Sequence, residues 1–204
     1  MDSVYRELNT PYGTMLMYPP YKNHAFDGAL AVCYNKGTKE NSGVFCHTQG
    51  WAILAEAILG RGDRAYEYLK EISPAYMNED ANRRVIEPYV HGQSIEGKDS
   101  PFAGRAHVHW LTGAATTSMV AMVEGILGIK PSPAGIVIDP SIPAAWDKLT
   151  MTKKFRGKIL DITINNPDCN QHGVKSTIVN GNKINNNFIS ESILESRNEI
   201  IINM

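Results

Sequence analysis

Apolar residues follow a helical spacing in the middle of the chain. Over residues 51–58 they recur at intervals of three or four positions, and Gly60 follows the last of them. This spacing predicts a helix that ends near Gly60, because glycine is the usual residue just beyond a helix. A second helix is predicted over residues 118–127, where Gly128 marks the end and Pro131 lies beyond.

The pattern changes from Gly135 onward to short pieces rich in β-branched residues. Such pieces predict an antiparallel sheet or a small sandwich. The dipeptide Asn180-Gly181 directly follows one of these pieces and predicts a two-residue hairpin turn. The predicted strands lie at residues 136–138, 149–152, 159–164, 176–179 and 200–202.

The first 47 residues contain three prolines and several glycines, which is typical of irregular connections. The whole chain has 204 residues, enough for one domain or two small ones. We therefore expect an α-then-β arrangement, with a helical part over residues 1–134 and a β-domain over residues 135–204.

Charge and hydropathy restrict the partners of the chain. The 20 Lys+Arg and 21 Asp+Glu residues give a formal net charge of −1, so no basic surface for nucleic acid or for a membrane stands out. The apolar stretches are too short to span a bilayer, and the N-terminus lacks the pattern of a signal peptide. These features favour a soluble, cytoplasmic protein with neither nucleic-acid nor membrane partners.

The cysteines and histidines suggest no metal site. Three cysteines without CxxC spacing argue against a disulfide framework and a zinc site. Cys46 stands beside His47, but adjacent residues of an extended loop point in opposite directions, so a buried Cys46 is preferred over a thiol nucleophile. His107 and His109 flank one residue as two metal ligands can, yet no third ligand has a matching spacing. We expect neither a metal nor another cofactor.

The two predicted helix starts carry polar residues that suit an anion. His47 lies at or just before the first helix, and Thr112-Gly113 leads into the second. Free N–H groups and the positive end of the helix dipole attract anions at such places. Capping of the helices is the alternative role for the same residues, and an anion site requires the two starts to converge.

Several motifs follow one another in the order of a known enzyme family. They include TKENSGVFCHTQGW, EPYVHGQ, HWLTGAA, GILGIKP and KFRGK, and they extend over most of the chain. The sequence thereby resembles the C-terminal part of the inverting β-glucoside phosphorylases of glycoside hydrolase family 94. The resemblance implies the last helices of an (α/α)6 barrel followed by a small antiparallel β-sheet or sandwich domain.

The resemblance also implies a reaction and its binding residues. In the family, inorganic phosphate cleaves a β-linked glucose disaccharide or oligosaccharide and yields α-glucose 1-phosphate. The general acid is an aspartate upstream of the residues matched here, so no catalytic residue is expected in this chain. A homodimeric parent enzyme is compatible with the resemblance. The matching positions are His47, Thr112 and Gly113 for phosphate, and Lys39, Glu40, Gln93 and Tyr34 for sugar.

Two functions of different classes are consistent with these features. The first is a piece of a glycoside phosphorylase that is inactive alone, and a start within the barrel-like region favours it. The second is a free-standing carbohydrate-binding or assembly module without catalysis. If barrel helices are missing, the helix faces led by Trp51 and Met119 should be uncovered and cause self-association.

Overall fold

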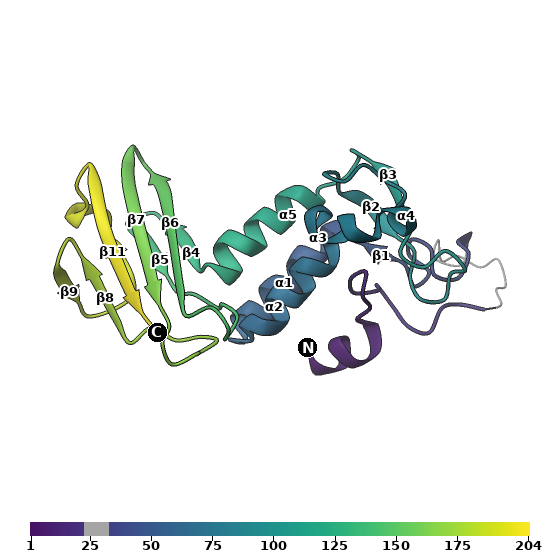
Figure 1. The fold of residues 1–204 in the computed structure, drawn as a ribbon, viewed down its shortest axis with the longest axis horizontal. Helices are drawn as coiled ribbons and strands as arrows, with labels where there is room; N and C mark the ends of the chain where they lie inside the picture. The colour runs from purple at the N-terminus through teal and green to yellow at the C-terminus, as the bar shows by residue number, and fades with distance from the viewer. Residues whose placement is uncertain (23–32) are drawn as a thin grey trace. The chain divides into compact units, whose positions relative to one another are not determined.

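The computed structural model describes residues 1–22 and 33–204. It divides into two compact units, which are described separately. The first unit holds residues 1–55 and 67–121, and the second holds residues 56–66 and 122–204. Figure 1 labels their elements, and the class is mixed α/β, with helices mainly in the first half and sheets mainly in the second.

The first half of the chain forms short helices around a small sheet (Figure 1). The predicted helix at 51–58 is confirmed within a longer helix, and the one at 118–127 is partly confirmed, because it starts earlier and becomes a π-helix at Ala121. The helical elements are η1 (Val4–Leu8), α1 (Cys46–Ile58), α2 (Gly62–Ile72), α3 (Pro74–Met77), η3 (Asn78–Asp80), α4 (Ala81–Arg84), α5 (Ala114–Val120) and η4 (Ala121–Ile126).

The sheet of the first unit has the antiparallel order β1 (Val44–Phe45), β2 (Gly92–Ile95) and β3 (Ala106–His109). One row of cross-strand neighbours, Val44, Ile95 and Ala106, belongs to the hydrophobic core. Cys46 and Ala114, the first residues of α1 and α5, belong to the same core cluster. The core therefore holds both helix starts next to one sheet.

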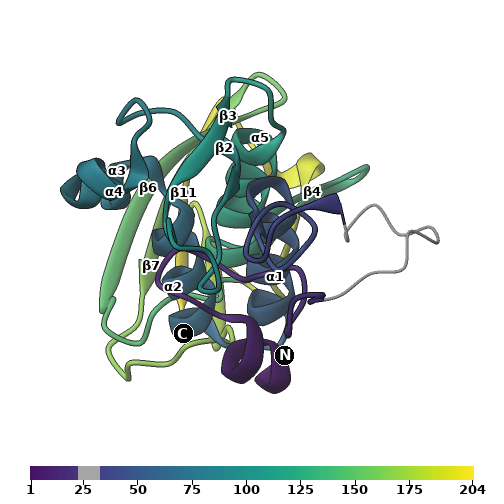
Figure 2. The same ribbon diagram turned by 90° about the vertical axis from the view of Figure 1, so that its right-hand side faces the viewer.

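The second unit contains two sheets. The five-stranded sheet has the order β6-β7-β11-β8-β9, and the three-stranded sheet has the order β10-β5-β4 (Figures 1 and 2). The strands are β4 (Ile129–Ser132), β5 (Gly135–Ile138), β6 (Lys148–Phe155), β7 (Lys158–Asn165), β8 (Ser176–Val179), β9 (Asn182–Ile184), β10 (Phe188–Ser190) and β11 (Arg197–Asn203), with η5 (Glu191–Ile193) before the last.

The β-strand predictions are confirmed with one correction. Asn180 and Gly181 have φ values of 49° and 78° and join β8 to β9, as a two-residue hairpin requires. The expectation of a purely antiparallel sheet is wrong, because β11 pairs with β7 in parallel. After β7 the chain forms β8, β9 and β10. It then forms β11, which lies beside β7 and runs in the same direction.

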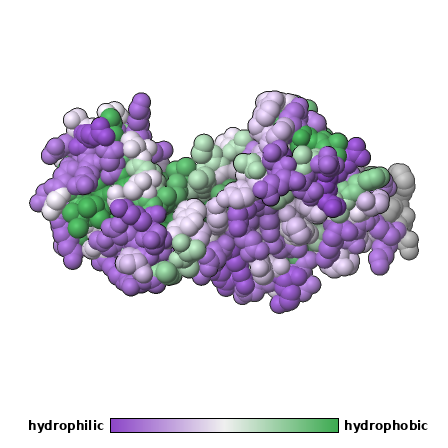
Figure 3. All heavy atoms as spheres, viewed as in Figure 1, coloured by the Kyte–Doolittle hydropathy of each residue, from purple (hydrophilic) through white to green (hydrophobic). Residues whose placement is uncertain are grey.

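Surface hydropathy differs from place to place. In the first unit Trp51 is 61% exposed and Met119 is 63% exposed, as predicted for the two helix faces. Figure 3 shows residues of high hydropathy as green patches on a mainly hydrophilic surface. Within residues 1–22 and 33–204, no helix combines the length and the apolar character needed to cross a membrane.

Candidate functional site

The loop that carries three of the predicted sugar ligands is held by buried hydrogen bonds. The Asn41 side chain is fully buried, donates to the main-chain oxygen of Tyr34 at 2.9 Å and accepts from the Tyr21 N–H at 2.8 Å. The Gly97 N–H donates to the carbonyl of Gly37 at 2.7 Å. A loop fixed in this way presents its side chains with little freedom, which favours ligand binding.

Two of the predicted sugar ligands line one recess. The ammonium of Lys39 lies 5.4 Å from the centre of the Tyr34 ring. Glu40 and Gln93 are half-buried and do not line this recess, although Oε2 of Glu40 is buried without a hydrogen-bond partner among the described residues. The recess has a volume of about 170 Å³ and is lined by Tyr34, Thr38, Lys39, Ser94, Ile95, Glu96 and His107.

The lining of the recess also holds a histidine–carboxylate pair that sequence reasoning missed. Nε2 of His107 lies 2.6 Å from Oε1 of Glu96, which is 6% exposed. The Ser100 hydroxyl donates to the other oxygen of Glu96. Strand pairing places Ser94 opposite His107 and thereby brings Glu96 within reach. Spacing along the sequence does not determine which residues of β2 and β3 lie opposite each other, so the pair could not be identified from spacing alone.

His109 has a different carboxylate partner. Its Nδ1 lies 2.8 Å from Oε2 of Glu87. A hydrogen bond within Glu87 to its own main chain, together with nearby His109, holds the pKa of this carboxyl below its usual range. The two histidines of β3 thus face separate carboxylates, and within residues 1–22 and 33–204 no group of three His, Cys, Asp or Glu side chains could hold a metal ion.

His47 is the second residue of α1. Its half-buried ring makes edge contacts with Phe45 and Trp51, at centroid distances of 5.3 and 5.9 Å. Neighbouring Cys46 is buried, as expected, and burial raises the pKa of its thiol to about 12, with Arg84 opposing the shift. Such a thiol stays protonated, so it cannot act as a nucleophile at neutral pH.

Thr112 and Gly113 form the start of α5. The Ala114 N–H donates to Oγ1 of Thr112 at 3.1 Å, so Thr112 has the capping role that was the alternative to anion binding. Its hydroxyl hydrogen can still be donated to a ligand. Gly113 is exposed, and a Cβ atom placed on it would meet nothing within 4 Å. The open space on the Cβ side of Gly113 leaves room for a ligand beside its backbone.

The starts of α1 and α5 converge. A Cβ atom on Gly50 of α1 would lie 2.6 Å from the carbonyl oxygen of Thr117 in the first turn of α5. Only glycine allows this approach, because any side chain would overlap the neighbouring backbone. The contact brings α1 and α5 together near their N-terminal ends, and a role of these ends in binding an anion stays a prediction.

Comparisons with known proteins show the family of this chain. Residues 1–128 match the family described as "Glycosyl hydrolase 94 superfamily, catalytic domain". The chain is 39% identical to N,N'-diacetylchitobiose phosphorylase of Vibrio furnissii, over 90% of this chain and 23% of that protein. It is 29% identical to solabiose phosphorylase of Paenibacillus borealis, over 90% of this chain and 24% of that protein.

The chain spans about a quarter of the length of these curated relatives, since the matches cover 23% and 24% of them. Among solved structures, a family GH92 alpha-mannosidase from Bacteroides thetaiotaomicron aligns with 69% of this chain and 17% of its own, at 16% identity and a TM-score of 0.34. A score this low supports no statement about the fold.

Proposed function

Because the chain belongs to the glycosyl hydrolase 94 superfamily, we propose that it is the C-terminal part of a longer inverting disaccharide phosphorylase. In the proposed reaction, an oxygen of inorganic phosphate forms a bond to the anomeric carbon of a β-linked sugar. The bond from that carbon to the leaving sugar breaks, and the leaving oxygen takes a proton from a general acid. The products are an α-sugar 1-phosphate and the released sugar.

Convergence of the helix starts is the observation that carries the phosphate site. Gly50 of α1 approaches Thr117 of α5, and the first residues of the two helices belong to one core cluster. Both helix dipoles then favour a dianion at the same place. His47 supplies a further charge-assisted hydrogen bond when protonated, and Thr112 and Gly113 supply a hydroxyl and an exposed N–H.

The sugar would lie against the loop held by Asn41. Tyr34 offers a ring face and Lys39 a charged donor in one recess. The buried, unpartnered oxygen of Glu40 is suited to accept from a sugar hydroxyl. Gln93 completes the proposed set with an amide that both donates and accepts.

The rest of the catalytic domain would lie outside this chain. It would provide the general acid, the remaining helices of an (α/α)6 barrel and a cover for exposed Trp51 and Met119. We propose a cytoplasmic location for the complete enzyme, and a homodimer is compatible with this proposal. A β-glucoside is the substrate that the sequence motifs favour, and N,N'-diacetylchitobiose is the alternative suggested by the name of the 39% identical relative.

The test compares the chain alone with the chain joined to the upstream remainder of its coding sequence. Phosphate release is measured from α-glucose 1-phosphate and from α-N-acetylglucosamine 1-phosphate, each with the matching sugar as acceptor. We expect no turnover by the chain alone and turnover by the longer protein. Turnover by the chain alone would show that an acid within it replaces the missing aspartate.

Variants of the longer protein test the phosphate site. His47→Ala should raise the KM for phosphate by about tenfold, which is the loss of one charge-assisted hydrogen bond. His172→Ala provides the matched control, because His172 is exposed in the second unit and bonds the Pro140 carbonyl. Equal kinetics for the two variants would remove His47 from the site.

A carbohydrate-binding module without catalysis is the second candidate. The recess beside Tyr34 and Lys39 favours it, because this recess is formed without any upstream residue. Sugar binding by the longer protein with no turnover on either sugar phosphate would support this role.

A further inference from the structure

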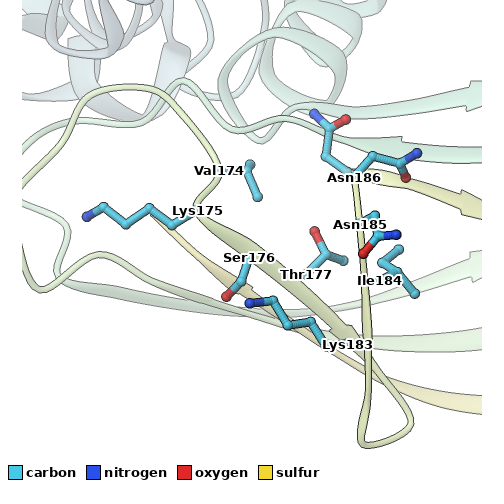
Figure 4. A pocket seen from close by; sticks show the side chains of 9 residues that line it. Val174, Lys175, Ser176, Thr177, Lys183, Ile184, Asn185 and Asn186 are labelled. Carbon is cyan, nitrogen blue, oxygen red and sulfur yellow. The ribbon is translucent and has the colours of Figure 1, made fainter.

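A second recess lies in the other unit, at one end of the five-stranded sheet (Figure 4). It has a volume of about 470 Å³ and is formed by residues 174–177, which lead into and begin β8, and by residues 183–187, which end β9 and lead toward β10. This volume falls within the range of small-molecule sites. None of the residues assigned to phosphate or to sugar lines it.

The lining is polar and contains no carboxylate. Lys175 is already engaged, because its ammonium donates to Asp168 at 2.5 Å and to the carbonyl of Met204 at 2.7 Å. The amide oxygen of Asn186 accepts from the Phe188 N–H at 3.1 Å. The Asn186 NH2 group, the Asn185 amide and the Lys183 ammonium make no hydrogen bond with another described residue, so they are free for a ligand.

The floor of the recess holds a buried hydroxyl without a partner. Thr177 is 1% exposed, and its Oγ1 makes no hydrogen bond within the described part of the chain. Its cross-strand neighbours are Ile184 on β9 and Ile202 on β11, neither of which can form a side-chain hydrogen bond. Figure 4 shows the Thr177 side chain between Val174 and Asn185. Buried hydroxyls are costly unless they find a partner, so this one calls for a ligand group or bound water.

We propose that this recess binds a neutral sugar. A sugar ring presents hydroxyls that both donate and accept, which matches the Asn185 amide and the Thr177 hydroxyl. Ile184 adds an apolar patch for the C–H face of the ring. Neutral groups outnumber the one free ammonium, which disfavours an anion as the main ligand. The site would hold carbohydrate on the β-sheet unit.

The test is an NMR titration of the ¹⁵N-labelled 204-residue chain with glucose, with N-acetylglucosamine and with inorganic phosphate. We expect a sugar to shift the amide signals of residues 174–177 and 183–187 with a dissociation constant in roughly the millimolar range, as is usual for so few hydrogen bonds. Phosphate should leave these signals in place. The amide signals of Tyr34 and Lys39 report on sugar binding in the recess of the first unit. The experiment therefore tests the proposed function and the present proposal independently.

Two variants and a control sharpen the result. Thr177→Val keeps the shape of the buried side chain but removes its hydroxyl, and Asn185→Ala removes an exposed amide. Each should weaken sugar binding by about fivefold, which corresponds to the loss of one hydrogen bond. Thr163→Val, on β7 of the same sheet, should leave binding unchanged. Absent shifts with both sugars, a response to phosphate alone, or equal binding by all three variants would overturn the proposal.

Discussion

The two units of this chain differ in what they bury. In the second unit most buried strand positions are aliphatic, with Thr177 and Asn198 as polar exceptions, and in the first unit the interior contains Asn41, Gln49 and Glu96. Polar interiors are costly unless every group is paired, whereas aliphatic ones stabilise simply by leaving water. The first unit therefore gives up some stability to fix its loops. The buried aliphatic residues of the second unit include Leu160, Ile162, Ile164, Ile200 and Ile202, each at most 1% exposed.

Both units expose large apolar side chains on their helices. Trp110 is 67% exposed and Leu111 is 71% exposed in the first unit, beside the proposed phosphate ligands Thr112 and Gly113. In the second unit Ile58 is 76% exposed, and within residues 129–204 the most exposed large apolar side chain is Ile193, at 45%. A unit with polar residues inside and large apolar residues outside is typical of a ligand site that further protein covers.

The largest expected effect tests the aliphatic interior. Ile162 pairs across strands with Ile200 and with Met151. Ile162→Ala should lower the free energy of unfolding by about 2–5 kcal/mol, because it leaves a cavity in a packed sheet. Urea denaturation followed by circular dichroism measures this change. Lys154→Ala, at an exposed position of β6, is the control, and similar losses for both variants would contradict the assigned core.

The second effect tests the polar interior. Gln49 is 2% exposed, accepts from the Thr14 N–H at 2.8 Å and donates to the Thr14 carbonyl at 2.8 Å. Gln49→Met keeps the side-chain length but leaves these main-chain groups unpaired, so it should cost about 1–3 kcal/mol in the same urea experiment.

The matched control comes from the second unit. Gln171 accepts from the Asp63 N–H at 3.0 Å in an exposed setting. Water can replace this bond, so Gln171→Met should change the free energy of unfolding by less than about 0.5 kcal/mol. A larger loss at Gln171 than at Gln49 would contradict the contrast between the two interiors.

Much of the fold could be predicted where periodicity was strong. The strand at 159–164 and the Asn180-Gly181 turn follow from local pattern and are present. Strands β9 and β10 were missed, because their asparagine-rich surroundings lack a β pattern and pairing with β8 and β5 supplies what local propensity does not.

The candidate site was predictable only in part. The burial of Cys46 followed from its residue type, and the convergence of the helix starts remained a condition for the structure to meet. Glu96 was not identified, because its contact with His107 depends on the pairing of β2 with β3. The roles of the named phosphate and sugar ligands remain predictions for kinetics to decide.

A third effect concerns pH. Burial raises the pKa of Glu71 to about 8, even though Asn9 donates to its carboxylate at 2.9 Å. The folded chain thus keeps this proton up to about pH 8, while the unfolded chain loses it near the ordinary value of 4.5. Stability should be greatest below this ordinary value and fall up to about pH 8, by at most about 1.4 kcal/mol per pH unit.

Urea denaturation at several pH values checks this dependence. Glu71→Gln stays neutral at every pH, so its stability should fall less between pH 5 and 8 than that of the parent chain. Glu79→Gln, at an exposed position, should keep the parent slope. If Glu71→Gln retained the full slope, the dependence would have to come from another group.

The smallest effect concerns the exposed apolar side chains. Met119 is 63% exposed on α5, and a free surface of this kind should make the chain associate with itself at high concentration. Met119→Glu introduces a charge whose burial in a contact is unfavourable, so it should weaken self-association about tenfold, or about 1.4 kcal/mol. Analytical ultracentrifugation over a concentration series measures this self-association.

Ile193→Glu is the control, at the most exposed large apolar position within residues 129–204. It should leave association unchanged if the contact surface lies in the first unit alone. A parent chain that stays monomeric throughout, or a stronger effect of Ile193→Glu, would show that the exposed face of the first unit is not a site of contact.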